Sequence, residues 1–202
     1  YYSYYYDPTY ILVLVGAILS IVASSMVQST YNKYAKVRSM SGMTGAQVAE
    51  LILRNKGITD VRIDHVSGNL TDHYNPKTKV INLSDTVYHS QSVAALGVAA
   101  HECGHVLQHE EKYFFIMLRS ILVPVVNFSS NFGYIIMIAG FLFSAFDLAM
   151  LGLIFMSMAL VFQLITLPTE FDASNRAAKE LVSLGVITES EVPQVKKMLR
   201  AA

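Results

Sequence analysis

Five consecutive residues near the middle of the chain, His101-Glu102-Cys103-Gly104-His105, fit the pattern H-E-x-x-H. Residues four apart on an α-helix project within about 40° of each other, one turn apart. Both imidazoles can therefore reach one zinc ion at about 2.0–2.1 Å. Glu102 then lies beside the open coordination position, where it can accept a proton from a water molecule that the metal has acidified. The motif predicts a hydrolytic zinc centre on a helix; the alternative is two unrelated histidines with an unrelated glutamate.

A catalytic zinc ion needs a third protein ligand and must keep one position free. His109 lies roughly 12 Å beyond His101 along a straight helix, so it cannot join the same ion. We interpret it as a residue on the surface or behind the site. Glu170, just after the last apolar segment, is the preferred candidate, and Asp172 is its rival. On the residues alone, Glu170 fits equally well as a helix N-terminal acid that the macrodipole stabilises.

The remaining chemistry-bearing residues have weaker claims. Cys103 points away from its histidine neighbours, because positions two apart on a helix differ by about 200°, and it is predicted to be a small buried residue. His73, Tyr74 and Arg176 are candidates for stabilising a tetrahedral oxyanion. The predicted strand Val80–Ser84 could pair with an extended substrate, or could simply be a sheet edge.

The composition indicates that part of the chain faces lipid, because 53% of its 202 residues are hydrophobic and 15% are charged. The segment Tyr10–Val27 is uncharged and about as long as a bilayer core is thick. No basic residue precedes it, which argues against a signal peptide, and the tyrosines of the N-terminal tail fit a membrane interface. We therefore expect a first transmembrane helix.

Two further apolar stretches are expected to form a transmembrane hairpin. The first starts after Arg119 and runs to Phe146, with residues 132–146 fully in lipid, and the second runs from Leu148 to Leu167. Asp147 between them is expected to cap the second helix.

The basic residues predict the orientation of these helices. All 15 Lys and Arg residues lie between the first span and the hairpin or after the hairpin. The N-terminal tail and the hairpin tip carry only Asp7 and Asp147, so the positive-inside rule places both polar regions in the cytoplasm. The two crossings return Glu170 to the membrane face that carries the histidine helix. Equal numbers of basic and acidic residues give no reason to expect a nucleic-acid partner.

The polar regions predict a mainly α membrane protein with a small β-sheet. Helices are expected over 45–56 and 92–110, from Pro168 or Thr169 to near Gly185, and from Thr188 or Ser190 onward, with strands over 61–66, 70–74 and 79–84. The expected division is an N-terminal tail and first span (1–30), a cytoplasmic region with the sheet and the H-E-x-x-H helix (31–118), a transmembrane hairpin (119–167), and cytoplasmic helices carrying Glu170 (168–202).

Four features occur together in this chain: the stretch TDHYNPKTKVINLS, the motif HECGH, the apolar hairpin and the segment TEFDASNRAA. In this combination the chain resembles membrane zinc metallopeptidases of the YugP type, which are bacterial relatives of the HtpX-like gluzincins. The resemblance covers essentially the whole chain. It implies that His101, His105 and Glu170 are zinc ligands and that Glu102 is catalytic. The HtpX-like pattern has an aspartate four residues after the ligand glutamate, whereas Ser174 stands here, which leaves open what orients a zinc histidine.

The resemblance implies an integral membrane zinc-dependent endopeptidase, with an α+β, zincin-like catalytic region on transmembrane helices. It would use a zinc-activated water at the cytoplasmic membrane face to cleave protein or peptide substrates, membrane proteins among them. It also implies that the chain continues past Ala202 into a further apolar segment. One alternative is a non-catalytic membrane zinc protein that acts as a scaffold or regulator. Another is a protease with its metal at bilayer depth, which the charged Glu110, Glu111 and Lys112 just after the motif disfavour.

Overall fold

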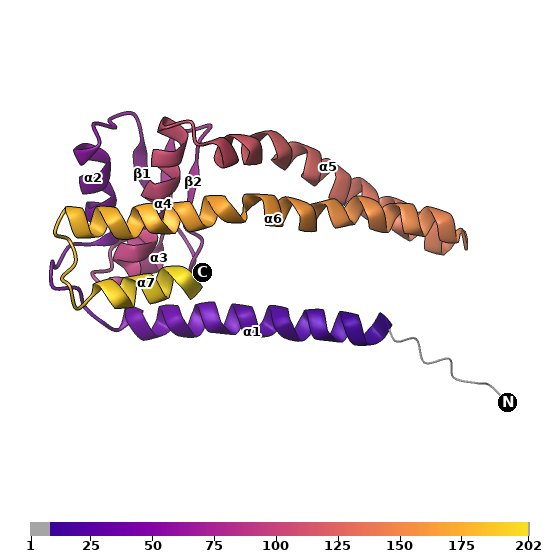
Figure 1. The fold of residues 1–202 in the computed structure, drawn as a ribbon, viewed down its shortest axis with the longest axis horizontal. Coiled ribbons are helices and arrows are strands. Elements are labelled where there is room, and N and C mark those ends of the chain that lie inside the picture. The colour runs from indigo at the N-terminus through magenta and orange to yellow at the C-terminus, as the bar shows by residue number, and fades with distance from the viewer. Residues whose placement is uncertain (1–8, 202) are drawn as a thin grey trace.

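The computed structural model describes residues 9–201 as a globular part from which three long helices extend in one direction (Figure 1). The fold is mainly α with a small β-sheet, as predicted. The elements in chain order are α1 (Thr9–Ala35), α2 (Gly45–Asn55), β1 (Arg62–Val66), β2 (His73–Asn75), β3 (Val80–Ser84), α3 (Asp85–Tyr88), α4 (Val93–Glu110), α5 (Phe114–Leu142), α6 (Phe146–Ser183) and α7 (Val192–Ala201).

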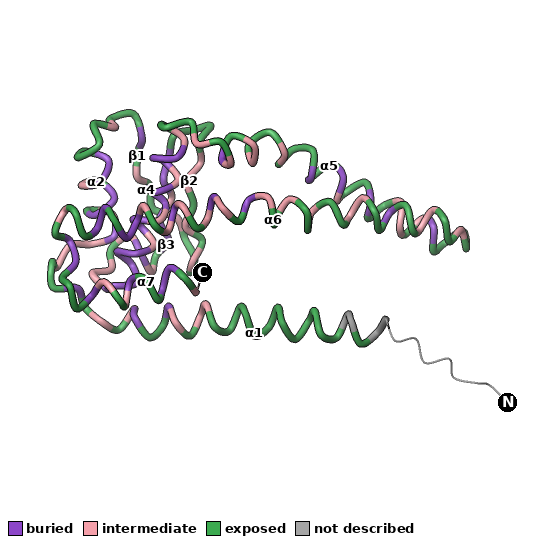
Figure 2. The backbone as a smooth tube through the Cα atoms, in the orientation of Figure 1, coloured by how far each residue is buried: buried purple, intermediate pink, exposed green. Residues whose placement is uncertain are grey.

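Helices α1, α5 and α6 are each long and apolar enough to cross a membrane. Buried residues concentrate in the globular part, whereas the extended portions of these helices are largely exposed (Figure 2). Large apolar side chains such as Leu19, Phe141 and Leu164 are more than 60% exposed there. A contiguous apolar surface of this extent is unfavourable in water and fits the hydrocarbon of a bilayer. The predicted span from Tyr10 to Val27 lies inside α1, and the tail tyrosines Tyr1–Tyr6 lie outside the described residues.

The hairpin differs from the prediction at both ends of α5. This helix begins at Phe114 and ends at Leu142, so Phe146 belongs to the next helix. Asp147 is not the cap of α6, because Ala145 occupies the N-cap position and Asp147 lies in the first turn. A carboxylate in a first turn still interacts favourably with the positive end of the helix dipole.

A new helix does not start at Pro168 or Thr169, because α6 runs unbroken from Phe146 to Ser183. Proline has no backbone N–H, which is tolerated in the first turn of a helix but costs a hydrogen bond in its interior. For this reason Pro168 suggested that a helix starts there. Beyond Pro168, however, Ala173 and Leu181 are fully buried in the globular part. Packing of this face outweighs the lost hydrogen bond, and a single long helix therefore carries Glu170 from the hairpin into the globular part.

The three-stranded sheet has the order β1-β3-β2, with β1 parallel and β2 antiparallel to β3. The strand β3 therefore lies in the centre, and its expected roles as a sheet edge or as a partner for an extended substrate are both wrong. The strand expected over 70–74 is reduced to β2, because Leu70 has a φ of 56° and belongs to the preceding turn. The expected helix over 45–56 is α2, whose capping box joins Thr44 and Gln47.

Helix α4 forms the centre of the globular part and packs against α2, α6 and α7. Its residues Val93, Leu96 and Val106 are fully buried. Gly104 lies where α4 crosses α6: a Cβ at this position would lie 2.6 Å from the carbonyl oxygen of Ala173. The two backbones can approach this closely only because Gly104 has no side chain, which explains a glycine inside a helix despite its cost in helix propensity.

We predict that Gly104→Ala destabilises the protein by about 1–3 kcal/mol, because the added methyl group must push α4 and α6 apart. Gly16→Ala is the matched control, since Gly16 is also helical and a Cβ there meets nothing within 4 Å. The control should leave the thermal midpoint unchanged or slightly higher. Thermal unfolding of both variants in the same detergent tests this; equal midpoints would show that the crossing tolerates a side chain.

Candidate metal centre

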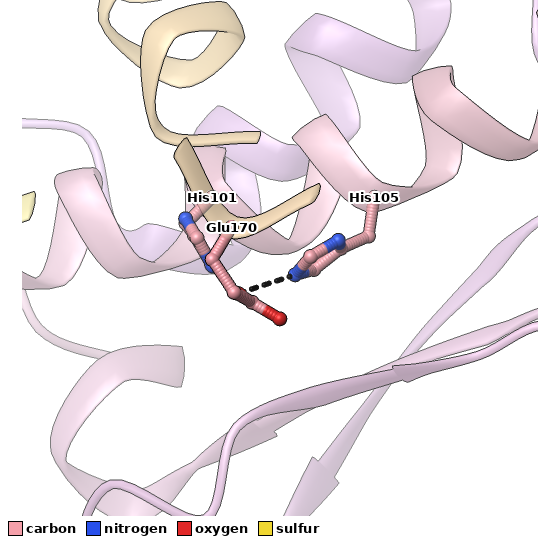
Figure 3. A group of neighbouring side chains, drawn as sticks. All are labelled: His101, His105 and Glu170. Atoms are coloured by element: carbon pink, nitrogen blue, oxygen red, sulfur yellow. Dashed lines mark hydrogen bonds and ion pairs between the residues drawn. The ribbon is translucent and has the colours of Figure 1, made fainter. Parts of the chain in front are cut away.

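The side chains of His101, His105 and Glu170 converge at the crossing of α4 and α6 (Figure 3). One ligand atom from each residue lies within 4.8 Å of the other two, and this is the only such group of three among residues 9–201. Oε2 of Glu170 lies 3.3 Å from Nε2 of His101 and 3.4 Å from Nε2 of His105. The structure thus brings together the three residues that the sequence singled out.

Regular secondary structure explains this convergence. His101 and His105 are one turn apart on α4, and their rings lie edge to face with centroids 4.8 Å apart. Glu170 comes from the part of α6 that follows the hairpin. The close contact between Gly104 and Ala173 lies one turn or less from each of these side chains along the two helices, so the backbone approach sets their separation.

The distances from Glu170 to the two imidazoles fit a zinc ion. Two ligand atoms of a tetrahedral zinc ion, with bonds of about 2.0–2.1 Å, are separated by about 3.3–3.4 Å. The two separations from Oε2 of Glu170, 3.3 and 3.4 Å, agree with this value. They are longer than the roughly 2.7–2.9 Å of a hydrogen bond between a charged nitrogen and a carboxylate. Two imidazoles and one carboxylate are also the donor set of a known class of catalytic zinc site.

Gln108 fixes the tautomer of His105. Its amide nitrogen donates to the carbonyl oxygen of Thr169 and to Oδ2 of Asp172, both at 2.8 Å. Its carbonyl oxygen therefore faces Nδ1 of His105, 3.0 Å away, and accepts the Nδ1–H hydrogen bond. Nε2 is left with its lone pair directed at the cluster. Asp172, the rival ligand, thus acts behind the site, where Arg176 also binds it at 2.5 Å.

Ser174 contacts the other imidazole. Its hydroxyl oxygen lies 3.2 Å from Nδ1 of His101 and can accept the Nδ1–H hydrogen bond. The HtpX-like pattern has an aspartate at this position. In this chain the neutral hydroxyl of Ser174 contacts the His101 ring in place of that carboxylate. Both histidines therefore have a hydrogen-bond partner on Nδ1, which directs Nε2 toward a metal.

Arg119 and Gln108 contribute to the site, and sequence reasoning missed both. Arg119 of α5 binds Oε1 of Glu170 at 2.5 Å. The signal for Arg119 was its position as the single basic residue between Tyr113 and Thr169. The signal for Gln108 was its spacing of three from His105, which places both on one helix face.

Burial and neighbouring charges shift the pKa of both Glu102 and His105. Glu102 is 7% exposed, and burial raises the pKa of its carboxyl group, although the imidazoles of His105 and His101 partly offset this effect. For His105, burial lowers the pKa, but the carboxylates of Glu170 and Glu102 reverse this and raise it overall. The cluster therefore attracts positive charge, as a metal site must.

The remaining candidates have other contacts. His109 packs edge to face against the ring of Tyr74, with centroids 5.6 Å apart. His73 contacts the Thr71 carbonyl and Asn82. The guanidinium of Arg176 is engaged by Asp172 and Glu111. Cys103 is buried, as predicted, and burial raises the pKa of its thiol, so it carries no reactive thiolate.

Comparisons with known proteins identify a zinc-dependent family. Residues 9–202 match the sequence profile of a family described as "putative neutral zinc metallopeptidase". A relative named "putative membrane protease YugP", from Bacillus subtilis (strain 168), is 46% identical over 184 residues. The matched region covers 91% of this chain and 82% of the relative. No solved structure matches the chain.

We predict that Glu170→Ala abolishes stoichiometric zinc binding, because two imidazoles alone do not complete the site. Zinc should raise the thermal midpoint of the unaltered protein, since it binds the folded state, and should not raise that of the variant. Glu189→Ala, which removes an exposed carboxylate, is the control. Metal analysis and thermal unfolding with and without a chelator provide the test. One zinc ion per chain in Glu170→Ala would contradict the assignment and direct attention to Asp172.

Proposed function

Because this chain belongs to the family described as "putative neutral zinc metallopeptidase", we propose that it is an integral membrane zinc-dependent endopeptidase that cleaves peptide bonds at the cytoplasmic membrane face. The observation that carries this proposal is the convergence of His101, His105 and Glu170 next to the buried Glu102. Two observations support the membrane setting: the similarity over most of the chain to a relative named "putative membrane protease", and three helices that can cross a membrane.

In this proposal Nε2 of His101, Nε2 of His105 and Oε2 of Glu170 would hold the zinc ion. When bound, zinc lowers the pKa of a coordinated water and polarises the substrate carbonyl. The carboxylate of Glu102 would take the proton of the attacking water and pass it to the amine that leaves when the C–N bond breaks. Glu102 must therefore hold the proton between the two transfers. Ser174 and Gln108 keep the two imidazoles oriented.

The proposed orientation rests on charge. Segments 31–118 and 168–202 carry all the basic residues outside the hairpin and lie in the cytoplasm, while segments 1–30 and 119–167 supply the membrane helices. The site lies where the hairpin meets the globular part, so substrate segments can arrive from the bilayer surface or from the cytoplasm. Peptides and proteins, membrane proteins included, are the proposed substrates.

Glu102→Gln should abolish proteolysis while leaving about one zinc ion per chain. The amide keeps the shape of the side chain but cannot accept the proton, and general acid–base catalysis contributes about 10²–10⁴-fold. Glu110→Gln is the matched control, since this glutamate ends the same helix and its side chain is exposed. Cleavage of a proteome-derived peptide library by the detergent-purified chain provides the readout.

Retained cleavage in zinc-loaded Glu102→Gln would refute the catalytic role. A zinc-loaded, unaltered chain that cleaves nothing in the library would favour a scaffold or regulator with a zinc site.

The orientation has its own test. Cys103 is 1% exposed, so the unaltered chain should not react with a membrane-impermeant maleimide. Asp147→Cys at the hairpin tip should react on intact cells, whereas Glu189→Cys should react only after the membrane is permeabilised. Both positions are exposed. The reverse labelling pattern would place the catalytic region outside the cell.

A further inference from the structure

Glu170 uses its two carboxylate oxygens differently. Oε2 faces the two imidazoles, at 3.3 and 3.4 Å, while Oε1 accepts a hydrogen bond from Nη1 of Arg119 at 2.5 Å. The two imidazoles therefore contact one oxygen of the carboxylate, and the arginine contacts the other. A carboxylate held in this way has a defined rotation about its terminal bond.

The position of Arg119 is costly unless it has a partner. It lies in the second turn of α5, and it is the single basic residue between Tyr113 and Thr169. An arginine at the edge of a membrane-spanning hairpin is unfavourable when unpaired and is found where it binds a carboxylate or faces a polar site. Here it reaches across the hairpin from α5 to Glu170 on α6. The same two helices pack closely further along, where Gly133 faces Gly152.

We propose that Arg119 is a positioning residue for the metal centre. It occupies Oε1 of Glu170, so that only Oε2 is presented to the metal, and a coordination position stays available for water and substrate. This inference rests on the proposed metal role of Glu170. It also makes the geometry of the centre depend on the hairpin, because α5 supplies the hydrogen-bond donor and α6 supplies the ligand.

The chemistry of arginine suits this role. Its guanidinium remains charged, is planar and offers several donors in a fixed arrangement, whereas the lysine ammonium is a flexible point charge. A fixed donor on Oε1 prevents the carboxylate from rotating to give both oxygens to the metal. Without Arg119, Oε1 is free to bind in addition to Oε2 and water, which raises the coordination number above four and crowds the position that substrate needs.

The test compares Arg119→Gln, Arg119→Lys and the unaltered protein after loading with cobalt(II), whose visible absorption reports coordination number without any substrate. Lys179→Gln is the control, because it removes an exposed positive charge from α6 outside the site. We expect the intense four-coordinate absorption of the unaltered protein and of Lys179→Gln to weaken in Arg119→Gln as Oε1 joins the metal. Arg119→Lys should give intermediate absorption.

Activity provides the second readout. At saturating zinc, Arg119→Gln should lower kcat by about 10–100-fold, the usual effect of removing a group that orients a metal ligand, while KM changes little. Arg119→Lys should recover part of kcat. A purely structural role would instead lower the thermal midpoint and leave the cobalt spectrum of the folded variant unchanged.

The outcomes separate this inference from the proposed function. A folded Arg119→Gln with the cobalt spectrum of the unaltered protein overturns the positioning role and leaves the metal centre intact. If Arg119→Gln does not fold, an unaltered cobalt spectrum in Arg119→Lys overturns it in the same way. An unaltered chain that binds no cobalt at all overturns the metal centre itself.

Discussion

The separation of the three donor atoms depends on how closely α4 approaches α6. Gly104 allows the carbonyl of Ala173 to lie where a Cβ would otherwise be, and this contact brings the histidine pair and Glu170 to about 3.3–3.4 Å. Each helix alone offers only part of a metal site. The close approach of the Gly104 and Ala173 backbones therefore sets the distances between the proposed metal ligands.

Around this contact, polar groups form a layer between an apolar hairpin and an apolar core. Gln108, Ser174 and Arg119 each engage one ligand side chain, and Asp172 holds Gln108 in place. Buried polar groups are costly when unpaired, so a chain of satisfied hydrogen bonds fixes both tautomer and rotamer. The ligands are thereby oriented before any metal binds, which reduces the cost of binding it.

Local patterns predicted the parts of the structure that are determined locally. The H-E-x-x-H spacing, the capping box at Thr44 and the apolar segments correspond to α4, α2 and the long helices. The number of membrane crossings placed Glu170 near the histidines, although its role as a ligand stays a prediction. Patterns failed where tertiary packing decides: α6 continues through Pro168, and β3 is central. The contacts of Arg119 with Glu170, and of Gln108 with Thr169 and Asp172, cross between helices, and no local pattern encodes them.

The proposed chemistry requires that His101, His105 and Glu170 bind one zinc ion. An anomalous difference map at the zinc absorption edge, from crystals of the zinc-loaded chain, tests it most directly. We expect one peak about 2.0–2.2 Å from Nε2 of both imidazoles and from Oε2 of Glu170, with Oε1 still on Arg119. A peak bound by Asp172 or His109 in place of Glu170, or no peak between α4 and α6, would contradict it.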